Sequence, residues 1–458
     1  MDENAEAGGF LIQLQGTLDA TSSFLWGPPL IVLILGVGLY LTFLLRGIQF
    51  TFLGQALYMG LVKRTERDGD GDISHFQALM TALSATVGTG NIVGVATAIM
   101  LGGPGAVFWM WMTGLVGMAT KFSEAVLAVK YRYKDEKGNM LGGPMTYIAA
   151  IGPHPVWSWM AMAFALFAAI ASFGIGNMVQ AHSVADTLDG AFGLPRVWTG
   201  VGMAALTAMV ILGGIKSIGR VTSAIVPVMI FIYVGAALYI LVSMVDGIPA
   251  VIGLIFESAF TPAAGAGGFA WAALRWGVAR GIFSNESGLG SSPIAAAAAK
   301  TNEPVAQALV SMTQTFIDTL VVCTMTAFVI LLTGAHLNGL EGGQVTTSAF
   351  SAALGADMGE GLVAVALAFF AYSTVLGWSY YGERATESLV GLWGVLPYRL
   401  VYCALVYVGA NLDLSVVWAF CDITNALMAL PNLVALVMLS PVVRAETVRY
   451  IKGKKWTQ

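Results

Sequence analysis

The sequence predicts an all-α integral membrane protein with eleven transmembrane helices, in which one extra N-terminal helix precedes an inverted repeat of five plus five helices. Three observations lead to this fold class. Hydrophobic residues make up 57% of the 458-residue chain and charged residues 10%, whereas soluble domains carry roughly 25% charged residues. Lys and Arg gather on one side of the predicted spans. Polar, glycine-rich segments interrupt two spans in matching positions, so we expect the first helix of each five to be broken.

Composition and residue spacing exclude several classes of function. The net charge of −4 offers no basic surface, so we expect no nucleic-acid partner. The three cysteines and four histidines are widely separated and form neither a zinc spacing nor a disulfide framework. The sequence shows no Ser–His pair and no cluster of His, Cys and Asp, so we do not expect an enzyme. The acidic N-terminus lacks the basic region of a signal peptide, and the first apolar segment should stay in the protein.

Eleven apolar segments approach the length needed to cross a bilayer, which is about 20 residues. Residues 22–45 carry no charge and form the first. The uncharged run 76–120 is split by the turn at 102–105 into two spans, and the second continues to about Lys130. The remaining spans are expected at 156–181, 197–215, 221–245, 269–299, 304–334, 361–386, 397–412 and 415–440.

This layout divides the chain into five parts. They are an N-terminal tail with the extra helix and a cytoplasmic segment (1–75), a first five-helix repeat (76–246), an extracellular loop (247–268), a second five-helix repeat (269–440) and a basic cytoplasmic tail (441–458). The outer segments 246–268 and 335–360 are rich in glycine and are expected to be partly helical.

The distribution of Lys and Arg predicts the orientation. With the N-terminus outside, 18 of the 22 basic residues fall in inner loops or the C-terminal tail, three fall within spans, and only Arg196 lies in an outer loop. Because positively charged loops stay in the cytoplasm, this count predicts an odd number of crossings and a cytoplasmic C-terminus. We expect a multi-pass protein of the plasma membrane, of the bacterial inner-membrane type.

Two spans contain polar, glycine-rich segments near their middle. The second span contains residues 84–91, SATVGTGN, and the seventh contains residues 280–290, RGIFSNESGLG. Glycine lets the backbone leave helical dihedrals, and irregular backbone within a membrane is tolerated where it lines a cavity. The ends of the half-helices then present N–H groups to anions and C=O groups to cations.

The positions of these two helices predict the inverted repeat. When the first span is set aside, each broken helix begins a group of five, and because five is odd the second group enters the membrane from the opposite side. Such repeats hold their binding site near the midplane. One alternative stays open, because Gly90 and Gly94 form a G-x-x-x-G spacing that can also serve close helix packing.

Other polar groups within the spans have two interpretations each. The adjacent hydroxyls of Ser373 and Thr374 suit a hard cation such as sodium, or they bond back to the carbonyl four residues earlier. Lys121 and Glu124 are i,i+3 neighbours and are expected to form a structural ion pair.

The remaining charges flank or follow the broken helices. Arg280 and Glu286 flank the polar segment of the seventh span and could pair with each other or with Glu124. We expect structural roles for Asp318 and Asp422, with proton relay as the alternative. Phe283 and Trp378 could wall a pocket or belong to the ordinary core.

Four segments resemble the sodium:alanine (alanine or glycine:cation) symporter family. The longest is residues 281–296, GIFSNESGLGSSPIAA, which resembles the signature of that family. The others are residues 84–92 (SATVGTGNI), 142–147 (GGPMTY) and 370–378 (FAYSTVLGW). The resemblance covers nearly the whole chain and implies a leucine-transporter-type fold with an extra N-terminal helix.

The resemblance also implies where the cargo binds. By position, it places the substrate at five residues of the first break, Thr86, Gly88, Thr89, Gly90 and Asn91. It also places the substrate at three residues of the second segment, Gly281, Ser284 and Asn285, and Phe283 and Trp378 are candidate walls of the same pocket. It assigns Na+ to the backbone carbonyls of two residues and the hydroxyls of two others: Ser84 and Val87, then Ser373 and Thr374.

The sequence therefore predicts a symporter that imports alanine and/or glycine with Na+ by alternating access. Its expected partners are that amino acid and membrane lipid, and a monomer is compatible with the sequence. Three alternatives stay open, namely H+ as the coupling ion, another small neutral amino acid as the substrate, and a passive channel. A channel would need polar residues along its whole pore, whereas here they are concentrated near the middle.

Overall fold

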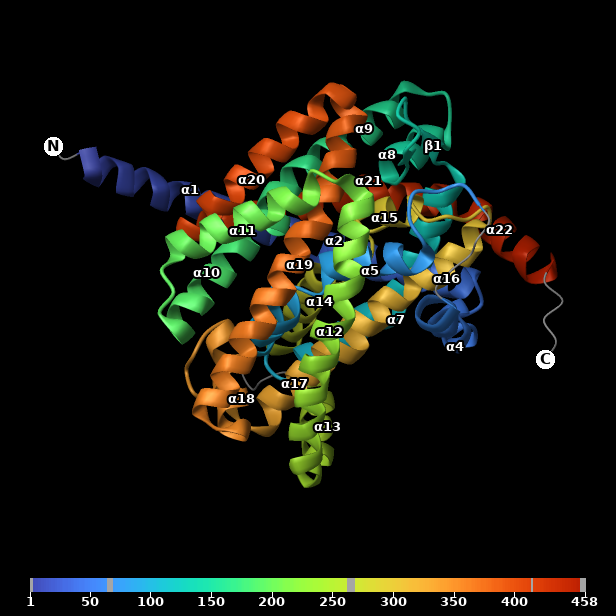
Figure 1. The fold of residues 1–458 in the computed structure, drawn as a ribbon. Coiled ribbons are helices and arrows are strands. Elements are labelled where there is room, and N and C mark those ends of the chain that lie inside the picture. The colour runs from blue at the N-terminus through green and yellow to red at the C-terminus, as the bar shows by residue number, and fades with distance from the viewer. Residues whose placement is uncertain (1–2, 64–68, 262–267, 413–414, 454–458) are drawn as a thin grey trace.

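The computed structural model describes residues 3–63, 69–261, 268–412 and 415–453, and these are almost entirely helical (Figure 1). The only sheet in these ranges is a short antiparallel hairpin of β1 (Tyr133–Lys134) and β2 (Met140–Leu141). Large apolar side chains such as Phe43, Phe231 and Val242 are exposed on the outside of the bundle, as expected for a surface that faces lipid. The predicted all-α membrane protein is confirmed.

The helices of the first half begin with the extra helix and end in a helical loop. They are α1 (Glu3–Leu25), α2 (Pro28–Leu44), α3 (Ile48–Thr51), α4 (Leu53–Leu57), the π-helix η1 (Tyr58–Lys63), α5 (His75–Thr86), the π-helix η2 (Gly90–Gly94), α6 (Val95–Gly102), α7 (Ala106–Lys130), α8 (Pro144–Tyr147), η3 (Ala149–Ile151), α9 (Pro155–Phe173), the π-helix η4 (Gly174–Met178), α10 (Val179–Phe192), α11 (Arg196–Ile211), α12 (Gly214–Ser243), η5 (Val245–Gly247) and α13 (Ile248–Phe260).

The helices of the second half run from the second broken helix to the C-terminal helix α22. They are α14 (Gly268–Asn285), α15 (Pro293–Ala297), α16 (Pro304–Thr315), the π-helix η6 (Phe316–Cys323), α17 (Thr324–Leu332), η7 (Ala335–Leu337), α18 (Gly343–Leu354), α19 (Ala356–Val390), η8 (Leu392–Gly394), α20 (Val395–Asn411), α21 (Ser415–Met438) and α22 (Ser440–Gly453). Both outer segments are partly helical, in α13 and α18, as predicted.

All eleven predicted spans correspond to helices. In the described residues, eight helical segments are long and apolar enough to cross a membrane, and the bent pair of α5 with η2 and α6 makes a ninth. The two other predicted crossings are α11, which has only 16 residues, and α14 with α15. Eleven crossings, and the boundaries of the two repeats, therefore stay predictions.

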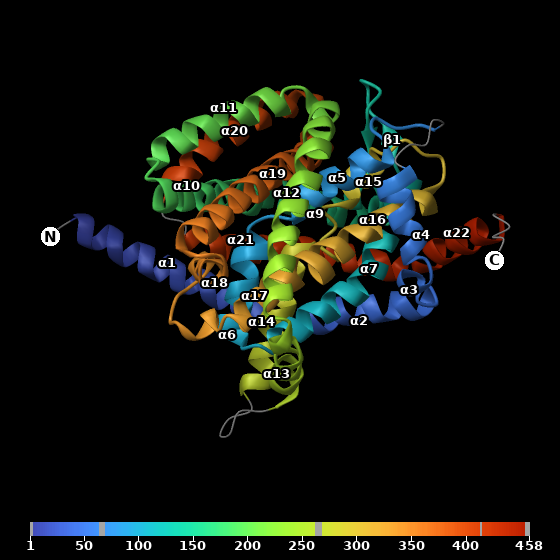
Figure 2. The same cartoon turned by 60° about the horizontal axis from the view of Figure 1, so that its bottom comes forward.

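The first span differs from its prediction at its start. A helix runs from Glu3, whereas the sequence predicted an N-terminal tail up to residue 21. It is interrupted at Gly27, and α2 starts at Pro28, whose missing N–H suits the first turn of a helix. In Figure 2, α2 lies along α7 at one edge of the bundle, so the extra helix packs outside the repeats.

The first broken helix has the predicted break. A capping box starts α5, in which the Ser74 hydroxyl accepts from the Gln77 N–H and the Gln77 side chain accepts from the Ser74 N–H. Helical geometry stops after Thr86, because Val87 has a ψ of 88°. The helix axis turns by 51° between α5 and α6.

The second broken helix is interrupted in the later part of the predicted segment 280–290. Residues 280–285 of that segment form the last turns of α14. The chain leaves helical geometry from residue 286 to 292, where Glu286, Gly288 and Gly290 have φ values of 56°, 90° and 81°. The break falls late in the segment because the two glycines that adopt positive φ come after Asn285, whereas Gly281 stays helical.

The bundle has two chemically different ends. We call the end with Lys130, Arg132, Lys134 and Arg449 the basic face, and it lies near β1 and α22 (Figure 1). The acidic face carries four carboxylates, two on α10, one just before α18 and one near the start of α19: Asp186, Asp189, Glu341 and Glu360. Four of the basic residues counted as inner lie outside the described residues: Arg64, Arg67, Lys454 and Lys455.

Candidate substrate and cation site

Two hydroxyls of α19 meet the end of α5. The Ser373 and Thr374 hydroxyls donate to the backbone carbonyl of Ser84 at 3.3 Å and 3.0 Å. Both also contact the Phe370 carbonyl, at 2.8 Å and 3.1 Å, so the back-bonded interpretation holds at the same time. Three oxygens predicted to bind Na+ are thus brought together in the buried interior.

Glycines allow this close approach. A Cβ at Gly377 would lie 2.8 Å from the backbone nitrogen of Ala85, and a Cβ at Gly88 would lie 2.3 Å from the Thr374 hydroxyl. Val87, the other predicted cation ligand, lies at the break with its N–H bonded to the Leu83 carbonyl at 2.8 Å. Ser84, rather than Val87, therefore supplies the carbonyl that both hydroxyls contact.

A small cavity of about 10 Å³ lies between the two broken helices, α10 and α19. Six predicted substrate residues line it: Thr86, Gly88, Thr89, Gly90, Phe283 and Trp378. Ala85, Ile175, Gln180, Glu286 and Thr374 complete the lining. This volume holds about one water molecule, so the site is closed tightly in this conformation.

The G-x-x-x-G alternative does not account for both glycines. A Cβ at Gly90 would lie 3.1 Å from the Cα of Ser284, so this glycine lets the two broken helices approach each other. A Cβ at Gly94 would meet nothing within 4 Å. Gly90 therefore allows close packing of the two broken helices beside the cavity, which it also lines, whereas Gly94 is not needed for packing.

Gln180 is a lining residue that the sequence analysis missed. Its side-chain amide donates to the Thr89 hydroxyl at 3.1 Å, and its oxygen accepts from the Thr89 N–H at 3.4 Å. A signal was present, because residues 174–177, GIGN, repeat the G-x-G-N pattern of residues 88–91. The segment 174–177 lies in the π-helix η4, which leads directly into α10.

Other predicted substrate residues do not line the cavity. Asn91 and Ser284 instead donate to the two oxygens of the buried Asp318 carboxylate, at 2.7 Å and 2.9 Å. Asn285 bonds to Thr319 at 3.1 Å, and a Cβ at Gly281 would lie 2.4 Å from the Thr113 hydroxyl: both face η6 and α7. Asp318 thus joins the two broken helices to each other.

An aromatic pair separates the cavity from the acidic face. The rings of Phe283 and Trp418 stack with centroids 5.6 Å apart, and the Arg280 guanidinium lies 5.5 Å and 6.0 Å from their centroids. Arg280 forms an ion pair with Asp422 at 3.5 Å. The suggested pairing of Arg280 with Glu286 is therefore wrong, because Arg280 turns away from the break.

Beyond this pair lies a larger pocket of about 1070 Å³ on the acidic face. Trp418 belongs to its lining, together with residues of α10, α18 and α19. We call Phe283, Trp418 and Arg280 the lid, because they lie between this pocket and the cavity.

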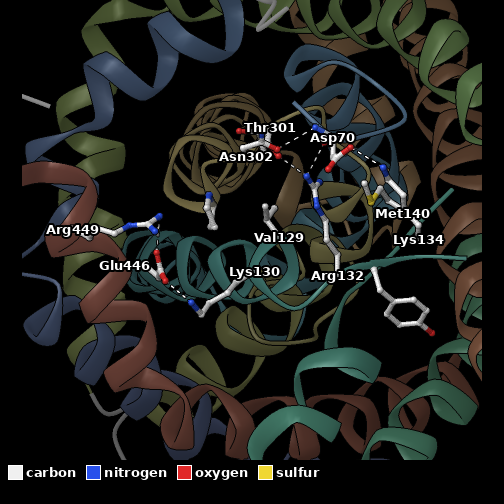
Figure 3. Close-up of a pocket in the computed structure, with 12 residues that line it drawn as sticks. Asp70, Val129, Lys130, Arg132, Lys134, Met140, Thr301, Asn302, Glu446 and Arg449 are labelled. Atoms are coloured by element: carbon white, nitrogen blue, oxygen red, sulfur yellow. Dashed lines mark hydrogen bonds and ion pairs between the residues drawn. The ribbon is translucent and has the colours of Figure 1, made fainter. Parts of the chain in front are cut away.

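On the basic face, one arginine ties together the segments that flank both broken helices (Figure 3). The Arg132 guanidinium donates to the carbonyl of Asp70, just before α5, at 2.7 Å. It also donates to the carbonyls of Ala297 and Ala299 at 2.7 Å each, and to that of Thr301. Burial lowers the pKa of Arg132 from its usual range.

Backbone hydrogen bonds reinforce this tie. The N–H of Asp72 donates to the Ala298 carbonyl at 2.8 Å, and the N–H of Lys300 donates to the Ile73 carbonyl at 2.7 Å. The Lys134 ammonium donates to the Asp70 carboxylate at 2.7 Å and lowers the pKa of that carboxyl. A pocket of about 500 Å³ opens beside these groups (Figure 3).

The predicted ion pair of Lys121 with Glu124 is confirmed, with 3.5 Å between the ammonium and the carboxylate. Both side chains are buried, and they contact the second break from α7. Glu124 also accepts from the Asn432 side chain of α21 at 2.7 Å.

Comparison with known proteins adds three findings. Residues 12–458 match the model of the Sodium:alanine symporter family. The chain is 50% identical over 443 residues to sodium/alanine symporter AgcS of Methanococcus maripaludis, covering 96% of this chain and 97% of that one. It is 38% identical to the probable sodium/glutamine symporter GlnT of Bacillus subtilis, over 96% and 92% of the two chains.

The fold also matches a solved structure. The crystal structure of MhsT in complex with L-phenylalanine superposes with a TM-score of 0.57, covering 84% of this chain and 93% of that one, at 14% identity. At that identity the similarity concerns the fold alone. MhsT has the leucine-transporter-type fold, so the fold implied by the sequence resemblance is confirmed.

Proposed function

Because the chain belongs to the sodium:alanine symporter family, we propose that it imports alanine and/or glycine together with Na+ by alternating access. The family and the relatives are transporters rather than enzymes, and the chain is a multi-pass membrane protein that carries an amino acid. The choice of amino acid, the ion site and the orientation are parts of the proposal.

The observation that carries the proposal is the meeting of Ser84, Ser373 and Thr374 beside the cavity. A carbonyl and two hydroxyls are neutral oxygen ligands of the kind that a hard cation prefers. They come from α5 and α19, so a bound Na+ would hold these two helices together. Thr374 also lines the cavity, which puts the ion next to the amino acid.

This arrangement supports coupling between the two cargoes. Na+ would order the end of α5, from which the cavity-lining residues Thr86 and Gly88 follow directly. If Na+ raises the affinity for the amino acid, the amino acid must raise the affinity for Na+ by the same factor.

The close packing of the helices around the cavity supports a small substrate. A Cβ at Gly176 would lie 2.1 Å from the Cβ of Trp378, so η4 and α19 approach closely beside the cavity. The relative named for glutamine shows that sequence similarity alone does not select the side chain. The glycines Gly88 and Gly90, with the bulky Phe283 and Trp378, favour alanine and glycine.

The charge of the two faces supports the orientation. We place the basic face in the cytoplasm and the acidic face outside, because Lys and Arg mark cytoplasmic loops. The pocket of the acidic face is then the outer entrance, closed from the cavity by the lid. The hydrogen bonds of Arg132 close the proposed cytoplasmic side. This conformation therefore corresponds to an occluded state that follows the outward-facing state in the proposed cycle.

Uptake into proteoliposomes tests the proposal. We expect radiolabelled alanine to accumulate against its gradient when an inwardly directed Na+ gradient is imposed. Unlabelled glycine should inhibit this uptake more strongly than unlabelled glutamine. A proton gradient imposed without Na+ separates the proton-coupled alternative. Accumulation driven only by protons would refute Na+ coupling, and purely downhill flux would favour a channel.

A further inference from the structure

Glu286 is the first residue of the second break and has an unusual backbone conformation. Its φ is 56°, a left-handed value that glycine adopts at a lower cost, and Arg46 is the only other non-glycine residue with positive φ in the described part of the chain. Its side chain is 1% exposed and lines the cavity. A strained residue at a cavity points to a role for its side chain.

The backbone of the break is held from outside by α7. The Lys121 ammonium donates to the Glu286 carbonyl at 2.9 Å and to the Ser292 hydroxyl at 2.7 Å. The Glu124 carboxylate accepts the N–H groups of Gly288 and Gly290, each at 3.1 Å. A cation thus faces the carbonyl that ends α14, and an anion faces the N–H groups that follow.

Among the described residues, Lys121 is the cation that contacts this break, and its ammonium is already engaged. Lys121 forms its ion pair with Glu124 and contacts Glu286 through the backbone carbonyl. The Glu286 carboxylate itself receives hydrogen bonds from the Ser291 hydroxyl and the Trp378 side chain, which are both neutral. Among the described ion pairs, none includes the Glu286 carboxylate. Glu124 is thus paired with Lys121, whereas the Glu286 carboxylate at the cavity wall has only neutral hydrogen-bond donors among the described residues.

We propose that the Glu286 carboxylate binds the α-ammonium group of the transported amino acid. A buried carboxylate is costly unless a positive group pairs with it, and the ammonium of a zwitterion supplies that group only when the cavity is occupied. The pair forms away from water, so it selects strongly for compounds with an amino group. This inference rests on the proposed function.

Two other roles for Glu286 make different predictions. A purely structural carboxylate would hold Ser291 and Trp378, and its removal would reduce stability without changing which compounds bind. A carboxylate that binds the coupling cation would affect Na+ binding when no amino acid is present.

The test measures binding to the purified full-length protein in detergent by isothermal titration calorimetry. L-Alanine is compared with L-lactate, in which a hydroxyl replaces the ammonium group, at saturating Na+. For Glu286→Gln we expect a loss of alanine affinity of about tenfold or more and a similar loss of preference over lactate. Na+-induced thermal stabilisation without amino acid should match that of the wild type. Glu257→Gln, the same change at an exposed site on α13, should bind as the wild type does.

The outcomes separate the inference from the function on which it rests. An unchanged preference for alanine in Glu286→Gln, or a loss of Na+ stabilisation alone, would overturn the assignment. If Glu286→Gln does not fold, Glu286→Asp keeps the charge but shortens its reach. It should lose alanine affinity severalfold while keeping the preference over lactate, and wild-type affinity would overturn the assignment. If the wild type binds neither alanine nor glycine, the proposed function fails, and the variants are compared using the amino acid that it does bind.

Discussion

Gly377→Ala offers a sharp test of the proposed cation site. The added Cβ would lie 2.8 Å from the Cβ and backbone nitrogen of Ala85 and from the hydroxyl of Ser84. Ordinary contacts of a Cβ begin at 3.4 Å, and the obstacle includes backbone, which cannot rotate away. The helices α19 and α5 must therefore separate by about 0.6 Å, the difference between these two distances.

This separation acts directly on the oxygens. A shift of about 0.6 Å would lengthen the contact between Thr374 and the Ser84 carbonyl from 3.0 Å to about 3.6 Å, beyond hydrogen-bond distance. Overpacking typically costs about 1–3 kcal/mol. We expect about 1.4 kcal/mol of that cost to fall on the closed, ion-bound conformation, which corresponds to a tenfold change in affinity. The Na+ concentration for half-maximal alanine uptake should therefore rise about tenfold.

Uptake into proteoliposomes at graded Na+ concentrations measures this effect. The matched control is Gly361→Ala on the same helix, where a Cβ would meet nothing within 4 Å. It should transport normally and be slightly more stable, because alanine favours the helix over glycine. Wild-type Na+ activation in a folded Gly377→Ala protein would contradict our interpretation of this junction.

Four further predictions follow from the same structure. The double variant Ser373→Ala/Thr374→Ala should raise the half-maximal Na+ concentration while changing the melting temperature little, and unchanged Na+ activation would remove both residues from the site. Arg280→Gln should release bound radiolabelled alanine severalfold faster than the wild type, because the lid loses its ion pair with Asp422. Equal release rates would show that the lid does not retain the substrate. Arg132→Gln should increase hydrogen–deuterium exchange in residues 69–73 and 297–301, and unchanged exchange would show that the backbone bonds suffice. Burial lowers the pKa of His336 below its usual 6.5, so the unfolded chain takes up a proton first as the pH falls. The melting temperature should therefore drop between about pH 7.5 and pH 5.5, and this drop should be smaller in His336→Gln.

The spans and the first break were predictable from the sequence for physical reasons. A lipid-facing helix needs a long apolar run, and the segments between such runs hold most of the charged residues. In the first break, glycines and polar residues fall at the break itself, so composition and geometry coincide.

The second break and half of the lining depend on tertiary structure. Residues 281–285 have the composition of a break but remain helical, because α7 supplies the groups that stabilise the unwound chain only after Asn285. Gln180 and Glu286 enter the cavity through the packing of α10 and α19 against the breaks. No local pattern reports such packing, although the G-x-G-N repeat marked the region of Gln180.

The contacts of Arg132 limit how the basic face of the bundle can open. One guanidinium and paired backbone groups fasten the start of α5 to the chain that follows α15, and pulling them apart would strip several carbonyls of their donors. If α5 or α15 moved outward alone, all of these hydrogen bonds would be broken. We therefore expect α5 and the segment around α15 to move together as one rigid unit. The two breaks would act as its hinges, so each transport cycle would move this pair of segments rather than one of them.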